Sequence, residues 1–377
     1  MVRRYLCFRS CFKKGIGIMK RNILLNPGPA TTTDSVKQAQ IVPDICPREK
    51  DFQDLMSSIR KDLVKIAGGN KNYTAILFAG SGTAAMEATM CSVVPEDHYA
   101  VIITNGVYGL RFCSIASANQ IPDIRIEHPS GKAIELDRIK NILERGINIG
   151  ATFVTHHETT TGILNPINEI GKIVKENGAP YVIDTISSFA GVPLSIKKCK
   201  ADFIMSTSNK CLQGMAGVSF VIAKKDALEK TRFNMRSVYL DLYNQHKYLE
   251  EHGQMRFIPP VQSMYALRQA IDELFEEGLE NRQERYKKNH QLLVKGMKDR
   301  GFKLFLTQQV DHSNILETFY EPKNFDFKQF HDKLYEKGFT IYPGKLTKEK
   351  TFRLSVMGDL HTIDIQNFLV AVTEVMK

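Results

Sequence analysis

The residue with the clearest chemical potential in this sequence is a lysine. Lys210 ends the polar turn at residues 206–210, immediately after the apolar run at residues 203–206. A lysine in such a turn is normally a solvated surface charge. A lysine that is withdrawn from water has a lower pKa and can form a Schiff base with an aldehyde. Lys210 is therefore a candidate for covalent attachment of an aldehyde.

A carboxylate ends the preceding strand-like run. Asp184 is the last residue of the apolar segment 181–184. Because an aspartate at the end of a buried strand is costly unless it is paired, a specific partner is expected. One interpretation is structural, with Asp184 capping the next turn through Thr185 or Ser187. The other is that Asp184 keeps the nitrogen of an aromatic cofactor ring protonated.

A turn of small residues follows a third apolar run. It spans residues 79–83, includes Ser81, Gly82 and Thr83, and precedes the helix-like segment 84–91. Small residues let the backbone approach an anion, and a helix N-terminus offers unpaired N–H groups. The spacing matches neither the dinucleotide fingerprint nor the P-loop, so a nicotinamide oxidoreductase is a weak alternative. An ordinary strand-to-helix turn is the structural alternative.

These three groups together specify one cofactor. In an open α/β sheet, ligands bind at the carboxyl ends of the strands, where all three groups fall. An aldehyde, a ring nitrogen and an anion are combined in pyridoxal 5'-phosphate, which we therefore predict as the cofactor. A metal is not predicted, because Cys7 and Cys11 have no second ligand pair nearby.

The segments that must position these residues alternate between short apolar runs and amphipathic stretches. This alternation predicts an α/β fold, with a mainly parallel sheet and helices on both faces. The predicted strands are 75–79, 100–104, 151–155, 181–184, 203–206 and 218–223, with helices at 135–145 and 166–177.

The C-terminal part has a different, α+β pattern. A polar helix is expected at 280–300, strands at 303–306, 315–319, 339–342 and 352–356, and helices at 327–337 and 362–376. Two domains follow, because 377 residues exceed what one core usually holds. We predict a large cofactor-binding domain at 21–270, which includes an N-terminal substrate-pocket segment, and a small domain at 271–377. Residues 1–20 are expected to be a disordered basic extension, with Met19 as the favoured translation start.

Composition excludes several other classes of protein. The net charge is +10, but residues 1–21 contain seven basic residues and no acidic one, so subtracting these seven leaves +3. The body therefore lacks the basic footprint of a nucleic-acid-binding protein. No apolar run approaches the ~20 residues that span a membrane. Seven scattered cysteines argue against a disulfide framework and favour the cytoplasm.

Further motifs give the chain a family resemblance. Segments 24–29, 105–111, 158–162 and 351–354 occur in order around the lysine and aspartate. Over residues 22–377 the chain resembles class V, fold-type I aminotransferases that depend on pyridoxal phosphate. The resemblance implies an enzyme that exchanges amino groups between small amino and keto or aldehyde substrates. It also implies a homodimer with the active site at the interface.

The resemblance assigns roles to individual residues. Lys210 and Asp184 are catalytic and also hold the cofactor. Ser81, Gly82 and Thr83 bind its phosphate, Tyr108 stacks on its ring, and Thr160 reaches the ring oxygen. Gly28 and Arg353 bind the substrate, with the arginine on its acid group.

Within this class the chain is most similar to the 2-aminoethylphosphonate–pyruvate aminotransferases. The similarity includes the threonine run 31–33, which is expected either to line a phosphonate pocket or to cap a helix starting near Asp34. The implied reaction yields phosphonoacetaldehyde and alanine, in either direction. An alanine–glyoxylate or serine–pyruvate aminotransferase is the alternative. A cysteine desulfurase is excluded because the last cysteine, Cys211, directly follows the lysine.

One position departs from the family pattern. Relatives place a threonine from the partner subunit on the cofactor phosphate, in a motif that aligns with residues 257–261. This chain has Ile258 at that place. The resemblance implies that Arg256 or Ser263 substitutes, or that the turn containing Ser81 and Thr83 is sufficient.

Overall fold

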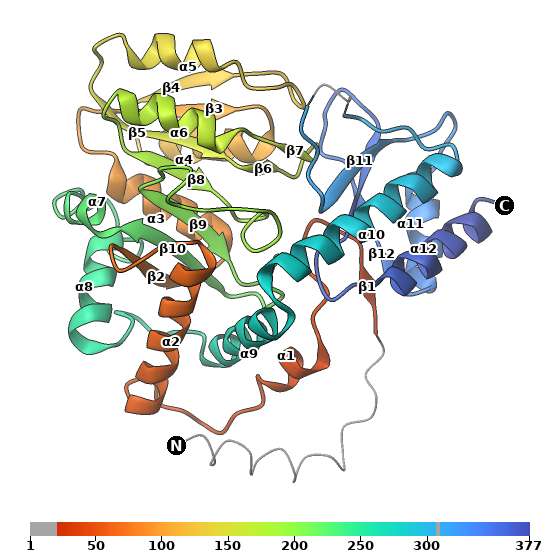
Figure 1. The fold of residues 1–377 in the computed structure, drawn as a ribbon, viewed down its shortest axis with the longest axis horizontal. Helices are drawn as coiled ribbons and strands as arrows, with labels where there is room; N and C mark the ends of the chain where they lie inside the picture. Colours follow the sequence, from red (N-terminus) through yellow and green to blue (C-terminus); the bar gives the residue numbers. More distant parts are fainter. Residues whose placement is uncertain (1–20, 307–309) are drawn as a thin grey trace.

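The structure, a computed structural model, describes residues 21–306 and 310–377. The expectations for residues 1–20 therefore lie outside the described residues. A seven-stranded sheet with the order β2-β10-β9-β8-β5-β3-β4 forms the larger part of the molecule (Figure 1). Its strands are β2 (Tyr73–Ala79), β3 (Tyr99–Thr104), β4 (Asp123–Glu127), β5 (Ile149–Thr155), β8 (Tyr181–Asp184), β9 (Phe203–Thr207) and β10 (Val218–Lys224).

The predicted sheet is confirmed as mainly parallel, with one exception. β10 runs antiparallel to both β2 and β9, whereas the remaining neighbours pair in parallel. A short link from β9 to β10 leaves no room for a crossover helix, so antiparallel pairing is the natural outcome. The edge strand β4 was not predicted, although its sequence alternates between polar and apolar residues; only Ile126 of its five residues is buried.

Helices cover both faces of this sheet. Right-handed crossovers place α3 (Gly82–Val93) and α4 (Val107–Ala118) on one face, and α5 (Leu136–Leu143) and α6 (Ile167–Glu176) on the other. The remaining helices of this part are α2 (Lys50–Ile66), α7 (Lys225–Glu229), α8 (Leu242–His252) and α9 (Val261–Glu277). A small hairpin, β6 (His157–Glu158) with β7 (Ile163–Leu164), follows β5.

A second hydrophobic cluster lies in the C-terminal part and includes buried residues of the long helix α10 (Leu279–Asp299). Its antiparallel sheet has the order β11 (Leu316–Tyr320), β14 (Thr351–Ser355), β13 (Tyr342–Pro343). Helices α11 (Phe327–Glu336) and α12 (Thr362–Val375) pack beside each other there. Of the strand expected at 303–306, the described residues form only an isolated bridge between Leu304 and Phe319.

The N-terminal segment connects the two parts. β1 (Ile23–Leu24) pairs in parallel with β12 (Phe339–Thr340), and in Figure 1 it lies among the blue C-terminal elements. Ile23 and Leu25 belong to the C-terminal hydrophobic cluster. The short helix α1 (Asp34–Gln38) instead packs on α9 of the large sheet's part. The segment therefore crosses from the small part to the large one, whereas the sequence analysis grouped it with the large domain. No helix of residues 21–306 and 310–377 is long and apolar enough to cross a membrane.

Candidate active site

The ends of neighbouring strands bring the predicted catalytic residues together. Asp184 is the last residue of β8, and Lys210 lies three residues after the end of the adjacent strand β9. The charges of Asp184 and Lys210 act on each other's pKa, so the two groups share one site. The turn before α3 is also close, since a Cβ on Gly82 would lie 2.7 Å from Ile186 Cδ1.

The Lys210 amine is enclosed by the N-terminal segment. Its Nζ donates a hydrogen bond to the carbonyl of Pro27. Burial lowers the pKa of Lys210, which favours the neutral, nucleophilic amine. Gly28 makes this enclosure possible, because a Cβ there would lie 2.2 Å from Nζ and 2.7 Å from Cε of Lys210. Its φ of +114° is also one that side-chain-bearing residues rarely adopt.

Asp184 is buried with one backbone donor. Its Oδ1 accepts a hydrogen bond of 2.8 Å from the amide of Ile186. Burial raises the pKa of Asp184 from 3.8 to about 7. Asp184 therefore caps the following turn through the amide of Ile186, and not through Thr185 or Ser187 as the structural interpretation expected. A single cap leaves the carboxyl able to accept a proton donor from a ligand, so the structural and functional interpretations are compatible.

Tyr108 lies at the start of α4 among cations. The Arg111 guanidinium is 4.7 Å from its ring centroid, and Arg111 Nη1 donates to Thr83 Oγ1 at 3.2 Å. Arg111 thereby links the Tyr108 ring to the turn before α3. Arg111 belongs to the motif at residues 105–111, but the sequence alone assigned it no role. The signal was its spacing, three residues after Tyr108 on the same helix face.

A buried glutamate organises the next motif. Glu158 accepts hydrogen bonds from the amides of Tyr108 (2.9 Å), Gly109 (3.2 Å) and Thr160 (3.1 Å), and from the Thr160 hydroxyl (2.5 Å). Burial raises the pKa of Glu158. The Thr160 hydroxyl is thus donated to Glu158 in this structure. Its predicted contact with a cofactor ring oxygen stays a prediction. The sequence did not indicate this structural role of Glu158. The α4 amides that bind its carboxylate lie about fifty residues earlier in the chain.

Arg353 is buried in the middle strand of the small sheet. Its Nε donates to the Pro343 carbonyl at 3.0 Å and its Nη1 to the Thr159 carbonyl at 3.2 Å. Burial lowers the pKa of Arg353, although a guanidinium keeps its charge at neutral pH. Two backbone acceptors therefore fix the fork, and its charge acts on Lys210 and Tyr108 in the same site.

The threonine run at 31–33 is occupied by structural contacts. Thr31 Oγ1 accepts a hydrogen bond from the Leu24 amide at 2.9 Å. Thr33 Oγ1 accepts from the Val36 amide at 3.2 Å, as the N-cap of α1, and donates to Glu273. Of the two interpretations, the structure shows the helix cap.

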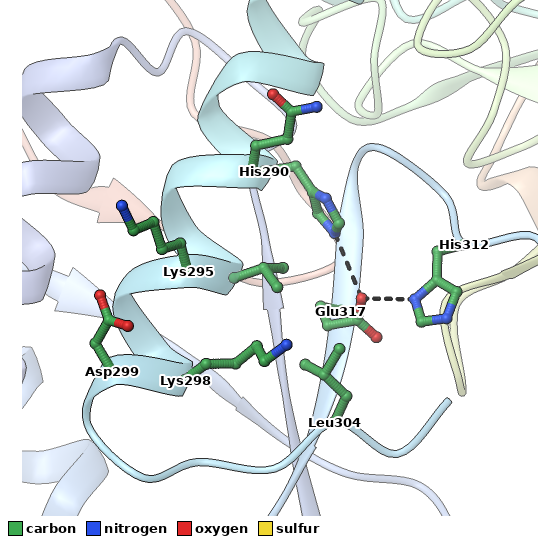
Figure 2. Close-up of a pocket in the computed structure, with 9 residues that line it drawn as sticks. His290, Lys295, Lys298, Asp299, Leu304, His312 and Glu317 are labelled. Atoms are coloured by element: carbon green, nitrogen blue, oxygen red, sulfur yellow. Dashed lines mark hydrogen bonds and ion pairs between the residues drawn. The ribbon is translucent and has the colours of Figure 1, made fainter. Parts of the chain in front are cut away.

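A surface cavity of about 460 Å³ lies elsewhere, beside α10 (Figure 2). In it the Glu317 carboxylate lies 3.0 Å from His312 Nδ1 and 3.6 Å from His290 Nε2. None of the predicted site residues lines it. The described residues contain no group of three or more His, Cys, Asp and Glu side chains arranged to hold a metal ion.

Comparison with known proteins agrees with the site's chemistry. The family model for class-V aminotransferases matches residues 37–367. The chain belongs to this family. It is a pyridoxal-phosphate-dependent transaminase of fold-type I.

Individual relatives cover nearly the whole chain. A 2-aminoethylphosphonate–pyruvate transaminase of Phocaeicola vulgatus is 40% identical over 363 residues, covering 95% of this chain and 100% of the relative. The enzyme of that name from Lysinibacillus sphaericus is 39% identical, with coverages of 91% and 94%. The solved alanine–glyoxylate aminotransferase of a Nostoc species has a TM-score of 0.88 at 27% identity, with coverages of 96% and 98%.

The residues of the site fit this cofactor. Lys210 is enclosed and has a lowered pKa, as attack on an aldehyde requires. The buried carboxyl of Asp184 shares that site, and the helix N-terminus at Ser81 with Thr83 offers donors for a phosphate.

Replacing Gly28 by alanine should disable Lys210 while leaving the fold intact. The added Cβ would occupy the position of the amine, and a displacement of about 1 Å can cost about a hundredfold in rate. Gly28→Ala should therefore lose most activity and the visible absorbance of the lysine-bound cofactor. Gly146→Ala is the matched control, because φ there is +69° and its Cβ would meet no atom within 4 Å. Equal effects of both substitutions would show that backbone strain, not displacement of Lys210, is responsible.

The cofactor-free protein should gain stability at neutral pH when Asp184 becomes asparagine. Because the pKa is raised from 3.8 to about 7, folded Asp184 holds a proton that the unfolded chain releases in this range. Stability from this group therefore falls as pH rises from about 4 to 7, by an amount on the order of a few kcal/mol. Urea unfolding should show that the free energy of unfolding of Asp184→Asn, relative to that of the wild type, is higher at pH 8 than at pH 5. The exposed Asp137→Asn is the control, and a pH-independent difference for Asp184→Asn would contradict the pKa shift.

Proposed function

We propose that this enzyme transfers the amino group between 2-aminoethylphosphonate and pyruvate, giving phosphonoacetaldehyde and alanine, in either direction. Relatives bearing that name are 37–40% identical over 91–95% of the chain. The observation that carries the proposal is that one site contains both Lys210, enclosed by Pro27 and Gly28, and the fixed guanidinium of Arg353, whose charge acts on Lys210. In this proposal Lys210 moves protons, and Arg353 holds the acid group of the substrate.

Each residue has a defined task in this reaction. Bound pyridoxal phosphate supplies the electron sink for the carbon next to the substrate amine. With the cofactor bound, Lys210 Nζ would accept the proton from that carbon. Asp184 holds a proton on the ring nitrogen by supplying a negative charge in a buried site. Arg353 orients the substrate through its acid group with a planar pair of donors.

We also propose that Gly28, Tyr108 and Thr160 act on ligands as the family resemblance implies. Gly28 shapes the space beside the Lys210 amine. The Tyr108 ring is positioned by Glu158, which fixes the start of α4. Thr160 can turn its hydroxyl from Glu158 toward a ring oxygen only by giving up a 2.5 Å hydrogen bond.

A homodimer is proposed from the chain's apolar surface. Phe233 is 86% exposed and Ile258 is 70% exposed. Tyr239 stacks on Phe257 at 5.0 Å and both rings are exposed, so these two rings and the adjoining Ile258 form one apolar patch, which we call the 239–258 patch. Exposed apolar groupings of this kind mark association surfaces. It includes part of the segment 257–261, which the family resemblance assigns to the partner subunit's cofactor phosphate. In this chain the nearby Ser263 hydroxyl donates to the Ala216 carbonyl at 3.0 Å.

We place the enzyme in the cytoplasm. The five cysteines of the described residues are all free, and four of them are buried. Burial raises the pKa of Cys211, Cys199, Cys113 and Cys91, which keeps these thiols protonated and unreactive. Thiols in this state are typical of a reducing compartment.

The substrate proposal is tested by single-turnover half-reactions of the holoenzyme. At matched concentrations, 2-aminoethylphosphonate and alanine should discharge the lysine-bound cofactor at least about tenfold faster than glycine or serine. Loss of the visible band reports each reaction. The result that would overturn the proposal is alanine with glyoxylate, or serine, as the best pair by more than tenfold. The enzyme would then belong with the alanine–glyoxylate or serine–pyruvate group.

The dimer proposal is tested at Ile258. Ile258→Glu should shift the enzyme from dimer to monomer in light-scattering chromatography, because a charge would enter an apolar interface. Ile363→Glu is the matched control, since Ile363 on α12 is 58% exposed and lies in the small part. A dimer that tolerates Ile258→Glu as well as Ile363→Glu would place the interface elsewhere.

A further inference from the structure

The Tyr108 hydroxyl lies among three cationic side chains from different parts of the chain. Lys345 Nζ is 3.4 Å from this hydroxyl and 5.1 Å from the ring centroid. Burial alone would raise the pKa of Tyr108, but the charges of Lys345, Lys210 and Arg353 lower it below its usual value. Lys210 and Arg353 already have tasks in the proposed reaction. Lys345 has none.

Backbone contacts fix the position of the chain next to Lys345. The link between β13 and β14 starts at Gly344, whose amide donates to the Thr351 carbonyl at 2.7 Å. A Cβ on Gly344 would lie 2.1 Å from Thr351 Oγ1, so this close approach requires glycine. Arg353 follows two residues after Thr351 on β14. Lys345, in the link between β13 and β14, and Arg353, on β14, therefore reach the same tyrosine.

A phosphonate demands more of a site than a carboxylate does. It has three oxygens and carries up to two negative charges, whereas a carboxylate has two oxygens and one charge. Arg353 supplies one positive charge, and two of its five N–H groups are used by Pro343 and Thr159. The hydroxyls of Thr31 and Thr33 are occupied by structural contacts. A second cation is needed, and it must come from elsewhere.

We propose that Lys345 is a specificity-determining residue, whose ammonium binds the phosphonate group together with Arg353 and distinguishes it from a carboxylate. The inference rests on the proposed function. Lys345 is exposed, so its long side chain can move from the Tyr108 hydroxyl onto a ligand. A compact ammonium with three rotatable donors suits an anion whose oxygens point in several directions.

The test compares a phosphonate with a carboxylate on the holoenzyme. Lys345→Met removes the charge and keeps the length of the stem. The concentration of 2-aminoethylphosphonate for half-maximal discharge should rise about tenfold or more, as expected for loss of a charge-assisted contact. The maximal rate should change little, and the constant for alanine should change by less than about twofold. Lys345→Arg should restore most of the phosphonate binding.

Unreactive probes separate binding from chemistry. Calorimetry with ethylphosphonate and propionate should show Lys345→Met losing affinity for the phosphonate only. The wild-type preference for ethylphosphonate should weaken at high salt, because exposed charges are screened. Lys348→Met is the matched control, as Lys348 is an exposed lysine of the same β13–β14 link.

The outcomes separate the two proposals. If the wild type reacts with 2-aminoethylphosphonate but Lys345→Met weakens phosphonate and carboxylate equally, the role of Lys345 is refuted and the proposed function stands. An equal effect of Lys348→Met would also refute it, by showing a general effect of charge on the loop. If the wild type fails to discharge with 2-aminoethylphosphonate, the proposed function and this inference fall together.

Discussion

The site depends on removing the Lys210 amine from water without giving it a carboxylate as its hydrogen-bond acceptor. A buried lysine that bonds to a carboxylate keeps its proton, because the pair is stabilised as ions. Lys210 donates instead to the neutral carbonyl of Pro27, and burial lowers its pKa. The amine is thereby ready to lose its proton and attack. Gly28 supplies the space for this, because any side chain there would take the place of the amine.

This enclosure explains the path of the N-terminal segment. The cover over Lys210 must be held in place from both sides, and the contacts on either side of Gly28 do so. The Leu25 carbonyl accepts from the Ser355 amide of β14 at 2.9 Å, and the Ala30 amide donates to the Asn209 carbonyl at 3.0 Å. The first contact ties the segment to the small sheet that carries Arg353. The second ties it to the residue beside the lysine. One continuous segment of the chain thus contacts both the strand that carries Arg353 and the residue before Lys210.

Sequence patterns predicted what depends on local rules. The strands ending at Asp184 and leading to Lys210 were foreseen because short apolar runs bounded by polar turns are characteristic of buried parallel strands. In the C-terminal part, β11, β14 and the helices α10, α11 and α12 were also foreseen to within a few residues. The strand expected at 339–342 is divided between β12 and β13, and the one expected at 303–306 forms only an isolated bridge. The helices α2, α8 and α9 were not, although α2 buries a regular apolar face. The path of residues 23–30 could not be predicted, since its pairing with β12 joins positions more than 300 residues apart. Lys345 was missed for the same reason, because its contact with Tyr108 joins positions 237 residues apart.

Two buried carboxylates show why residue type alone does not reveal function. Glu158 and Asp184 are each the last residue of a strand, both are almost fully buried, and burial raises the pKa of each. Glu158 accepts four hydrogen bonds, three of them from backbone amides, and so its burial is offset within the protein. Asp184 accepts one backbone hydrogen bond, from Ile186. Its charged form is therefore poorly stabilised until a cationic ligand arrives. A protonated ring nitrogen would provide that charge. The interaction would offset the unfavourable free energy of burying charged Asp184 and would thereby strengthen cofactor binding. The number of hydrogen-bond donors around a carboxylate, which only the three-dimensional structure reveals, separates an acid that is satisfied within the protein from one that is left open to a ligand.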